Sequence, residues 1–76
     1  MEHTAVKYGW RYEKTTERSA TIFNRKGDKC LMVLFTGKKY IFWDMAGNKL
    51  MSGNKNPAGA LENILTKYYY CKPIKI

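Results

Sequence analysis

The sequence has few of the residues from which catalytic, metal and disulfide sites are built. It holds one histidine, two cysteines and six acidic residues in a chain of 76. Cys30 and Cys71 match no zinc-binding or Cys-x-x-Cys spacing, and two cysteines are too few for a disulfide framework. The histidine, His3, lies in a segment that we expect to be frayed, so no Ser-His-Asp or Cys-His pair can be assembled. We therefore expect a protein that is not an enzyme, with no metal and no cofactor.

Long apolar runs are also missing. No stretch approaches the roughly 20 apolar residues that a transmembrane helix needs. Residues 1–7 contain no apolar segment of signal-peptide length. We expect no membrane partner and a cytoplasmic location, where both cysteines stay free thiols.

Positive charge is abundant by contrast. Fourteen lysines and arginines face six acids, which gives a net charge of +8, and eleven of the fourteen are lysines. Lysine acts as a point charge and not as a bidentate fork, so this composition favours contact with phosphate backbones or acidic protein surfaces over base reading by arginine. The alternative is that surface lysines merely keep a small protein soluble.

Glycines recur every ten residues, at Gly27, Gly37 and Gly47, each in a short polar break between β-branched and aromatic runs. Glycine supplies the positive φ that hairpin turns demand. This spacing predicts a β-meander within one small domain, residues 1–76. Residues 1–5 are expected to be frayed, and residues 72–76 to form a tail or an edge strand. The expected strands are 6–14, 18–24, 30–35, 40–43 and a short one at 49–51.

One helix should follow the strands. Asn56 is a favourable N-cap and Pro57 suits the first helical position. The helix should end near Tyr70, before Pro73. Its apolar stripe is Leu61, Ile64, Leu65 and Tyr68. The fold class is therefore α+β, an antiparallel meander of four to five strands followed by one C-terminal helix packed on one face.

Residues 30–35 and 40–43 are apolar at both parities, so both faces of the central strands need cover. A helix is about 10–12 Å wide and covers only the middle strands of one face. Three solutions remain open for the other face. The sheet curls into a small barrel, two chains form a homodimer, or the face is an exposed binding surface.

Aromatic residues interleave with basic ones in residues 7–12, 38–43 and 67–72. Unpaired bases stack on aromatic rings while lysines follow the phosphates. Alternate turns of a meander share an end, so the charges around Gly27 should lie with Lys49, and Lys38 and Lys39 at the other end. The candidates for nucleic-acid or anion binding are Arg11, Arg25, Lys26, Lys29, Lys38, Lys39, Tyr40 and Lys49.

Three aromatic residues are candidates for a protein interface: Trp43, Tyr69 and Tyr70. Tyrosine and tryptophan are enriched at interfaces because each buries a large ring and keeps a polar tip. The alternative for Trp43 is a place in the core, and for each turn charge an ordinary solvated position.

The first functional hypothesis is a non-catalytic module that binds nucleic acid or a nucleotide-type anion. The second is a protein–protein inhibitor of the phage-encoded, anti-defence type that docks on an acidic surface of a host enzyme. The third is a small self-associating structural protein. The element order resembles that of small β-sheet DNA readers such as AP2-type and integrase arm-binding domains, and of single-strand-binding coactivator domains. The signature residues of those families are absent.

Overall fold

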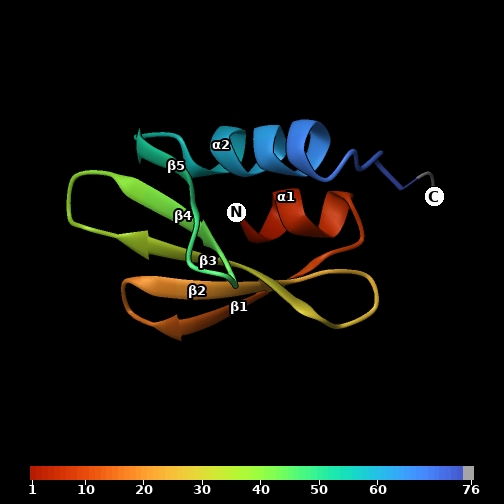
Figure 1. Ribbon diagram of the computed structural model, residues 1–76, viewed down its shortest axis with the longest axis horizontal. Helices are drawn as coiled ribbons and strands as arrows, with labels where there is room; N and C mark the ends of the chain where they lie inside the picture. The colour runs from red at the N-terminus through yellow and green to blue at the C-terminus, as the bar shows by residue number, and fades with distance from the viewer. Residues whose placement is uncertain (75–76) are drawn as a thin grey trace.

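The computed structural model describes residues 1–74 and confirms the α+β meander. Five strands form one antiparallel sheet in the order β1-β2-β3-β4-β5, and a helix follows them (Figure 1). The strands are β1 (Arg11–Thr16), β2 (Ser19–Phe23), β3 (Lys29–Phe35), β4 (Tyr40–Asp44) and β5 (Lys49–Asn54). The helices are α1 (Glu2–Lys7), α2 (Pro57–Asn63) and the π-helical segment η1 (Ile64–Tyr68).

The hairpin turns are built as the glycine spacing predicts. The backbone φ is positive at Gly27, Gly37 and Gly47, with values of 89°, 100° and 89°. The β4–β5 turn is also held by Asp44, whose Oδ1 accepts the backbone N–H groups of Ala46 at 3.0 Å and Asn48 at 2.9 Å. The hydrogen bonds from Asn48 hold the pKa of Asp44 below its ordinary value.

The N-terminus departs from the sequence prediction. Residues 1–5 are not frayed and the first strand does not begin at residue 6, because Glu2–Lys7 form helix α1. Ala5 is fully buried, whereas Val6 is 62% exposed. The helix ends at Lys7 with Tyr8 as its C-cap, and Gly9 follows with a φ of +78°, close to the side chains of Ile74 and Arg25. The burial of Ala5 therefore favours a helix here, although the sequence predicted a strand from residue 6.

The C-terminal helix begins as predicted and then changes its pitch. Gly59 N–H donates to the Asn56 side chain at 3.2 Å, which confirms the N-cap. In η1, Tyr69 N–H donates to Ile64 O at 3.2 Å, five residues back. This wider turn carries Tyr68 out of the predicted stripe to 53% exposure. Tyr69 faces inward instead and packs on Trp10, with ring centroids 5.1 Å apart.

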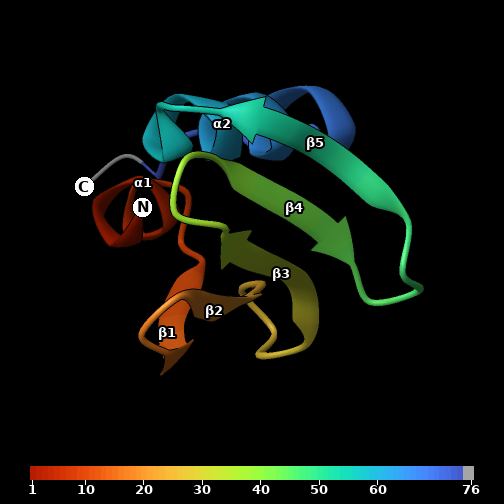
Figure 2. The ribbon, with the colours of Figure 1, turned by 90° about the vertical axis from the view of Figure 1, so that its left-hand side faces the viewer.

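Helix α1 and the C-terminal helix, which consists of α2 and η1, cover one face of the sheet. We call this the inner face, and the sheet curves around the helices (Figure 2). Leu31 and Val33 of β3 point inward and are buried. Met32 and Leu34 point to the opposite, outer face, where they are 39% and 37% exposed. Within one chain, only one of the two apolar faces of this strand is therefore covered. The sheet order runs from β1 to β5 as an open sheet, so curling is partial and does not close a barrel.

One apolar cluster forms the core between the inner face and the helices. It includes residues from β2, β3 and β4, from both helices, and from the connection after α1. Its members are Ala5, Tyr8, Trp10, Ala20, Ile22, Leu31, Val33, Phe42, Ala60, Leu61, Ile64 and Leu65.

The chain after η1 packs back on the start of the molecule. Residues 71–74 are not a strand, and Ile74 N–H donates to Lys7 O at 2.9 Å. The rest of the predicted tail or edge strand, residues 75–76, lies outside the described residues. Cys30 and Cys71 are free and half-buried. No helix within residues 1–74 has both the length and the apolar character required to cross a membrane.

Candidate basic and aromatic sites

The basic residues near one end of the sheet come from three separate segments. The turns β1–β2 and β3–β4 lie at this end, and so does the end of β5, because its last residue, Asn54, pairs with Tyr40 at the start of β4. We call this region the Lys38 end. Its cations are Lys14, Arg18, Lys38, Lys39 and Lys55.

A pocket of about 220 Å³ opens at the Lys38 end. Three aromatic side chains line it: Tyr12 from β1, Phe35 from β3 and Tyr40 from β4. Lys14 and Arg18 also line it, together with the carboxylate residue Glu17. Helix α1 starts part of the way along the inner face (Figure 1), and Met1 at its start lines one wall of the pocket.

Backbone and side-chain hydrogen bonds fix the two turns beside this pocket. Phe35 N–H donates to Arg18 O at 2.6 Å, which joins the β1–β2 turn to β3. Thr36 N–H donates to Lys39 O at 2.9 Å and closes the β3–β4 turn. The Phe35 and Tyr40 rings, at either side of that turn, lie 4.7 Å apart. Phe35, Tyr40 and the two turn lysines are thus held by the same hairpin, and Tyr12 of β1 completes the aromatic wall of the pocket.

The electrostatics of the Lys38 end favour an anion. Among residues 1–74, none of its five cations lies in a salt bridge, because the two ion pairs found there join Lys7 to Glu62 and Arg11 to Glu13. Burial raises the pKa of Tyr12, so its hydroxyl stays neutral at pH 7 and can both donate and accept a hydrogen bond.

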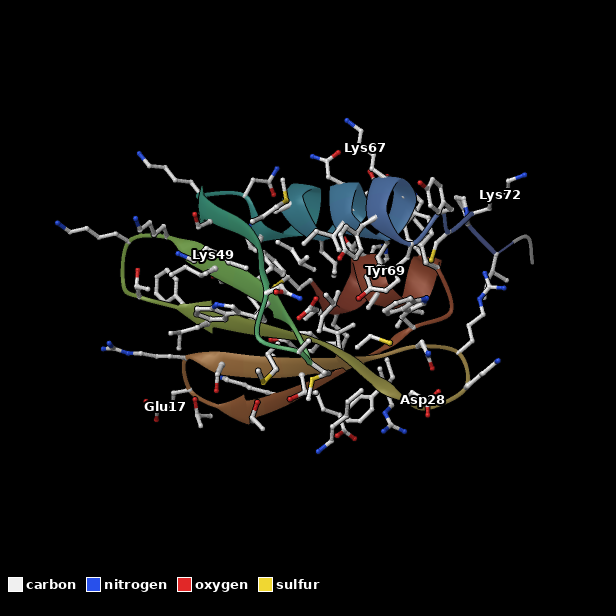
Figure 3. All side chains as sticks on the ribbon, in the orientation of Figure 1. Glu17, Asp28, Lys49, Lys67, Tyr69 and Lys72 are labelled. Carbon is white, nitrogen blue, oxygen red and sulfur yellow. The ribbon has the colours of Figure 1, made fainter. Side chains whose placement is uncertain are left out.

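The remaining candidates do not form one group. Arg25 and Lys26 lie near the opposite end of the molecule, where they line a shallow pocket with Tyr69 and Tyr70. Lys29 is exposed at the start of β3, beside the same turn. Lys49 does not join them, since Figure 3 shows it well apart from Asp28, and Figure 2 shows the two turns separated by the curvature of the sheet.

The outer face of the sheet carries Arg11 and Trp43. The guanidinium of Arg11 lies 4.3 Å from the centroid of the Phe23 ring and 3.5 Å from the Glu13 carboxylate. Its charge is therefore partly used within the fold. Trp43 is half-buried and pairs across the sheet with Met32 and Lys49.

Sequence reasoning missed several residues of the Lys38 end: Tyr12, Lys14, Arg18, Phe35 and Lys55. The place of Arg18 beside Lys38 and Lys39 was predictable, because the turns β1–β2 and β3–β4 of a meander lie at the same end of the sheet. Tyr12 and Phe35 were not predictable in this way, since their rings become accessible only where the helical layer stops.

Groups that could perform catalysis or hold a metal ion are scarce in the described part of the chain. No set of three or more His, Cys, Asp or Glu side chains gathers there in a metal-binding arrangement. Glu62 accepts hydrogen bonds from Lys7 Nζ and from the Tyr8 hydroxyl, both at 3.0 Å, and so links α2 to the end of α1. The hydrogen bond from Lys7 lowers the pKa of Glu62.

Comparisons with protein-family models, with curated proteins and with solved structures found no match to this chain. The arrangement of its own side chains is therefore what supports a functional proposal.

Proposed function

We propose that the protein is a non-catalytic module that binds single-stranded nucleic acid, or a nucleotide-type anion, through the Lys38 end. The observation that supports this proposal is the pocket lined by Tyr12, Phe35 and Tyr40 among cations that have no carboxylate partner within residues 1–74. An unpaired base would stack against the aromatic wall, and its phosphates would lie toward Arg18, Lys38 and Lys39.

The size of the pocket suits part of a ligand. At about 220 Å³ it is smaller than the 300–1,000 Å³ typical of sites that enclose a drug-sized molecule. A single base could enter while the sugar and phosphates stay outside. Stacking of one base on a protein aromatic ring contributes about 1–3 kcal/mol, and each neutralised phosphate adds a salt-dependent contribution.

The test is a titration of a labelled single-stranded oligonucleotide at several salt concentrations, followed by fluorescence anisotropy. The variant Lys38→Glu with Lys39→Glu should bind more weakly and should lose about 1.4 from the slope of log K against log salt, at about 0.7 for each single-strand phosphate. The matched control is Lys49→Glu with Lys67→Glu, which changes the net charge equally. Lys49 starts β5, at the opposite end of that strand from Asn54, and Figure 3 shows Lys67 over the C-terminal helix.

The control should lose much less affinity than the test variant. Equal losses in the two variants would mean that only net charge matters, and the pocket would then have no role. An absence of binding at tens of micromolar would contradict the proposal, since non-specific binding by basic proteins has a Kd of about 10⁻⁴–10⁻⁶ M at physiological salt.

A second candidate function, inhibition of another protein by docking on its acidic surface, is favoured by the outer face of the sheet. Met32 and Leu34 are more than one third exposed there, and Lys49 pairs with the neighbouring Trp43. Apolar side chains beside a cation suit an acidic protein surface. Recovery of one protein from lysate after nuclease treatment, lost on Leu34→Asp but kept on Lys38→Glu, would support this candidate over the first.

A further inference from the structure

Tyr70 has an unusual backbone conformation. Its φ is +55°, in the left-handed region that glycine adopts readily and bulky residues rarely do. Tyr70 is 83% exposed, more than any other large hydrophobic residue within residues 1–74. The ring therefore gains little from burial in this protein, although the chain holds it in a disfavoured conformation.

The end of the π-helical segment enforces this conformation. Cys71 N–H donates to Leu65 O at 2.8 Å, six residues back, and this bond ends the helix with Tyr70 in the left-handed region. Tyr69, the residue before it, is anchored on Trp10, and its hydroxyl donates to Cys30 O at 3.5 Å. Burial raises the pKa of Tyr69 to about 12, in agreement with its place against the core. Since both neighbours are fixed, the Tyr70 ring is presented outward from a defined position.

Tyr70 shares a pocket with basic residues. Tyr70 borders a shallow pocket of about 460 Å³ whose walls also include Trp10, Tyr69 and three cations. The cations are Arg25, Lys26 and Lys72, and the one carboxylate residue of the lining is Asp28. We call this region the Arg25 end.

The charge of Arg25 is held in place. Its Nε donates to Tyr8 O at 3.0 Å and its Nη2 donates to Lys72 O at 3.2 Å. Both acceptors are neutral carbonyl oxygens, so the guanidinium keeps its full charge while its position is fixed. The bond from Nη2 also brings Lys72 of the C-terminal segment beside the β2–β3 turn, which carries Arg25 and Lys26.

We propose that the Arg25 end is a second binding site for single-stranded nucleic acid, with a base stacked on Tyr70 and phosphates near Lys26 and Lys72. This inference rests on the function proposed for the Lys38 end. The longest extent of the molecule is 35 Å, and Figure 3 shows Glu17 and Lys72 toward its opposite ends. A short oligonucleotide would therefore occupy one site at a time, whereas a long strand would reach both or two strands would be held together.

The experiment measures stoichiometry by calorimetry with a tetranucleotide, and affinity with a strand of about thirty nucleotides. The intact protein should bind two tetranucleotides per chain and should bind the long strand on the order of 10²-fold more tightly, because the second contact becomes intramolecular. Tyr70→Ala with Lys26→Glu should leave one tetranucleotide site and remove most of that gain.

Conservative variants separate stacking from folding. Tyr70→Phe keeps the ring and should keep two sites. Tyr70→Gly relieves the positive φ and removes the ring, so it should leave the fold intact while it weakens the second site. A retained far-UV spectrum and melting temperature in each variant confirms that the fold survives.

The outcomes distinguish the two proposals. One tetranucleotide per intact chain, lost in the Lys38→Glu, Lys39→Glu variant but not in the Tyr70 variants, would overturn the second site and leave the Lys38 end standing. Binding that is unchanged by Tyr70→Ala with Lys26→Glu would also overturn it. No binding of either oligonucleotide would overturn the function proposed for the Lys38 end, and the second site with it.

Discussion

The inner and outer faces of the sheet are both apolar along β3, yet only one is covered. Leu31 and Val33 on the inner face are 0% and 2% exposed, while Met32 and Leu34 on the outer face are 39% and 37% exposed. Hydrophobicity is nearly equal at the two parities, so the residues of β3 alone do not explain the difference. The helices do, because α1 and α2 both pack on the inner face. A strand that is apolar at both parities can therefore have only one of its two faces buried within the chain.

The largest effect is expected for Leu65→Ala, on the buried side of η1. Leu65 is fully buried, so the variant should lose about 2–4 kcal/mol of the free energy of unfolding, from lost transfer energy and the cavity left behind. Urea denaturation followed by circular dichroism measures it. The matched outer-face variant Leu34→Ala should lose much less. Equal losses in the two would mean that the outer face is as well covered as the inner one.

The wider π-helical turn of η1 places two adjacent tyrosines in different surroundings, so we expect them to contribute unequally to the free energy of unfolding. Tyr69 packs on Trp10, whereas Tyr68 is 53% exposed. Tyr69→Ala should cost about 1–3 kcal/mol, below the usual cost for a fully buried aromatic residue, and Tyr68→Ala should stay within about 0.5 kcal/mol. Thermal melts of the two variants side by side measure the difference. A larger loss for Tyr68→Ala would mean that Tyr68, and not Tyr69, packs on the core, as the α-helical stripe predicted from the sequence requires.

The ion pair that ties α1 to α2 predicts a dependence of stability on pH. The pKa of Glu62 is lowered in the fold, so its contribution is present above the ordinary value of 4.5 and is lost as pH falls through the folded pKa. The pKa of Lys7 is raised above its ordinary 10.5, so its contribution is present below that value and is lost as pH rises through the folded pKa. Glu62→Gln should flatten both limbs of the pH–stability curve, by an amount limited by the solvent exposure of the pair.

Glu17→Gln is the matched control, since Glu17 lies in no salt bridge of the described chain. Its curve of melting temperature against pH should keep both limbs. If the Glu62→Gln curve also keeps them, the ion pair does not connect the helices in solution.

The smallest effect on the stability of one chain is expected at the outer face. Met32→Ser with Leu34→Ser should change the free energy of unfolding by about 0.5 kcal/mol per site, as at other exposed positions. The homodimer, one of the three solutions that the sequence left open, would use this face. Sedimentation equilibrium should then show association of the intact protein that weakens in the double variant. A mass of one chain at every concentration would contradict the homodimer.

Local signals gave much of the fold. The ten-residue glycine spacing located three hairpins, and the Asn56-Pro57 pair located the start of α2, because turns and caps depend on a few neighbouring residues. Of the residues in the proposed site, the sequence had singled out Lys38, Lys39 and Tyr40 through the interleaving of basic and aromatic residues. The grouping of Lys49 with the charges around Gly27 failed, since the curvature of the sheet separates turns that topology assigns to the same end.

The sequence by itself determined the order of the strands, the turns between them and the excess of positive charge, since each depends on local chemistry or composition. Only the tertiary structure decided that Glu2–Lys7 form a helix, that Tyr69 rather than Tyr68 faces inward, and that Tyr12 and Phe35 open into a pocket. Each of these depends on burial against residues distant in the chain. The burial of Ala5, the wider turn that seats Tyr69 on Trp10, and the point where α1 stops covering the sheet are properties of the packed molecule.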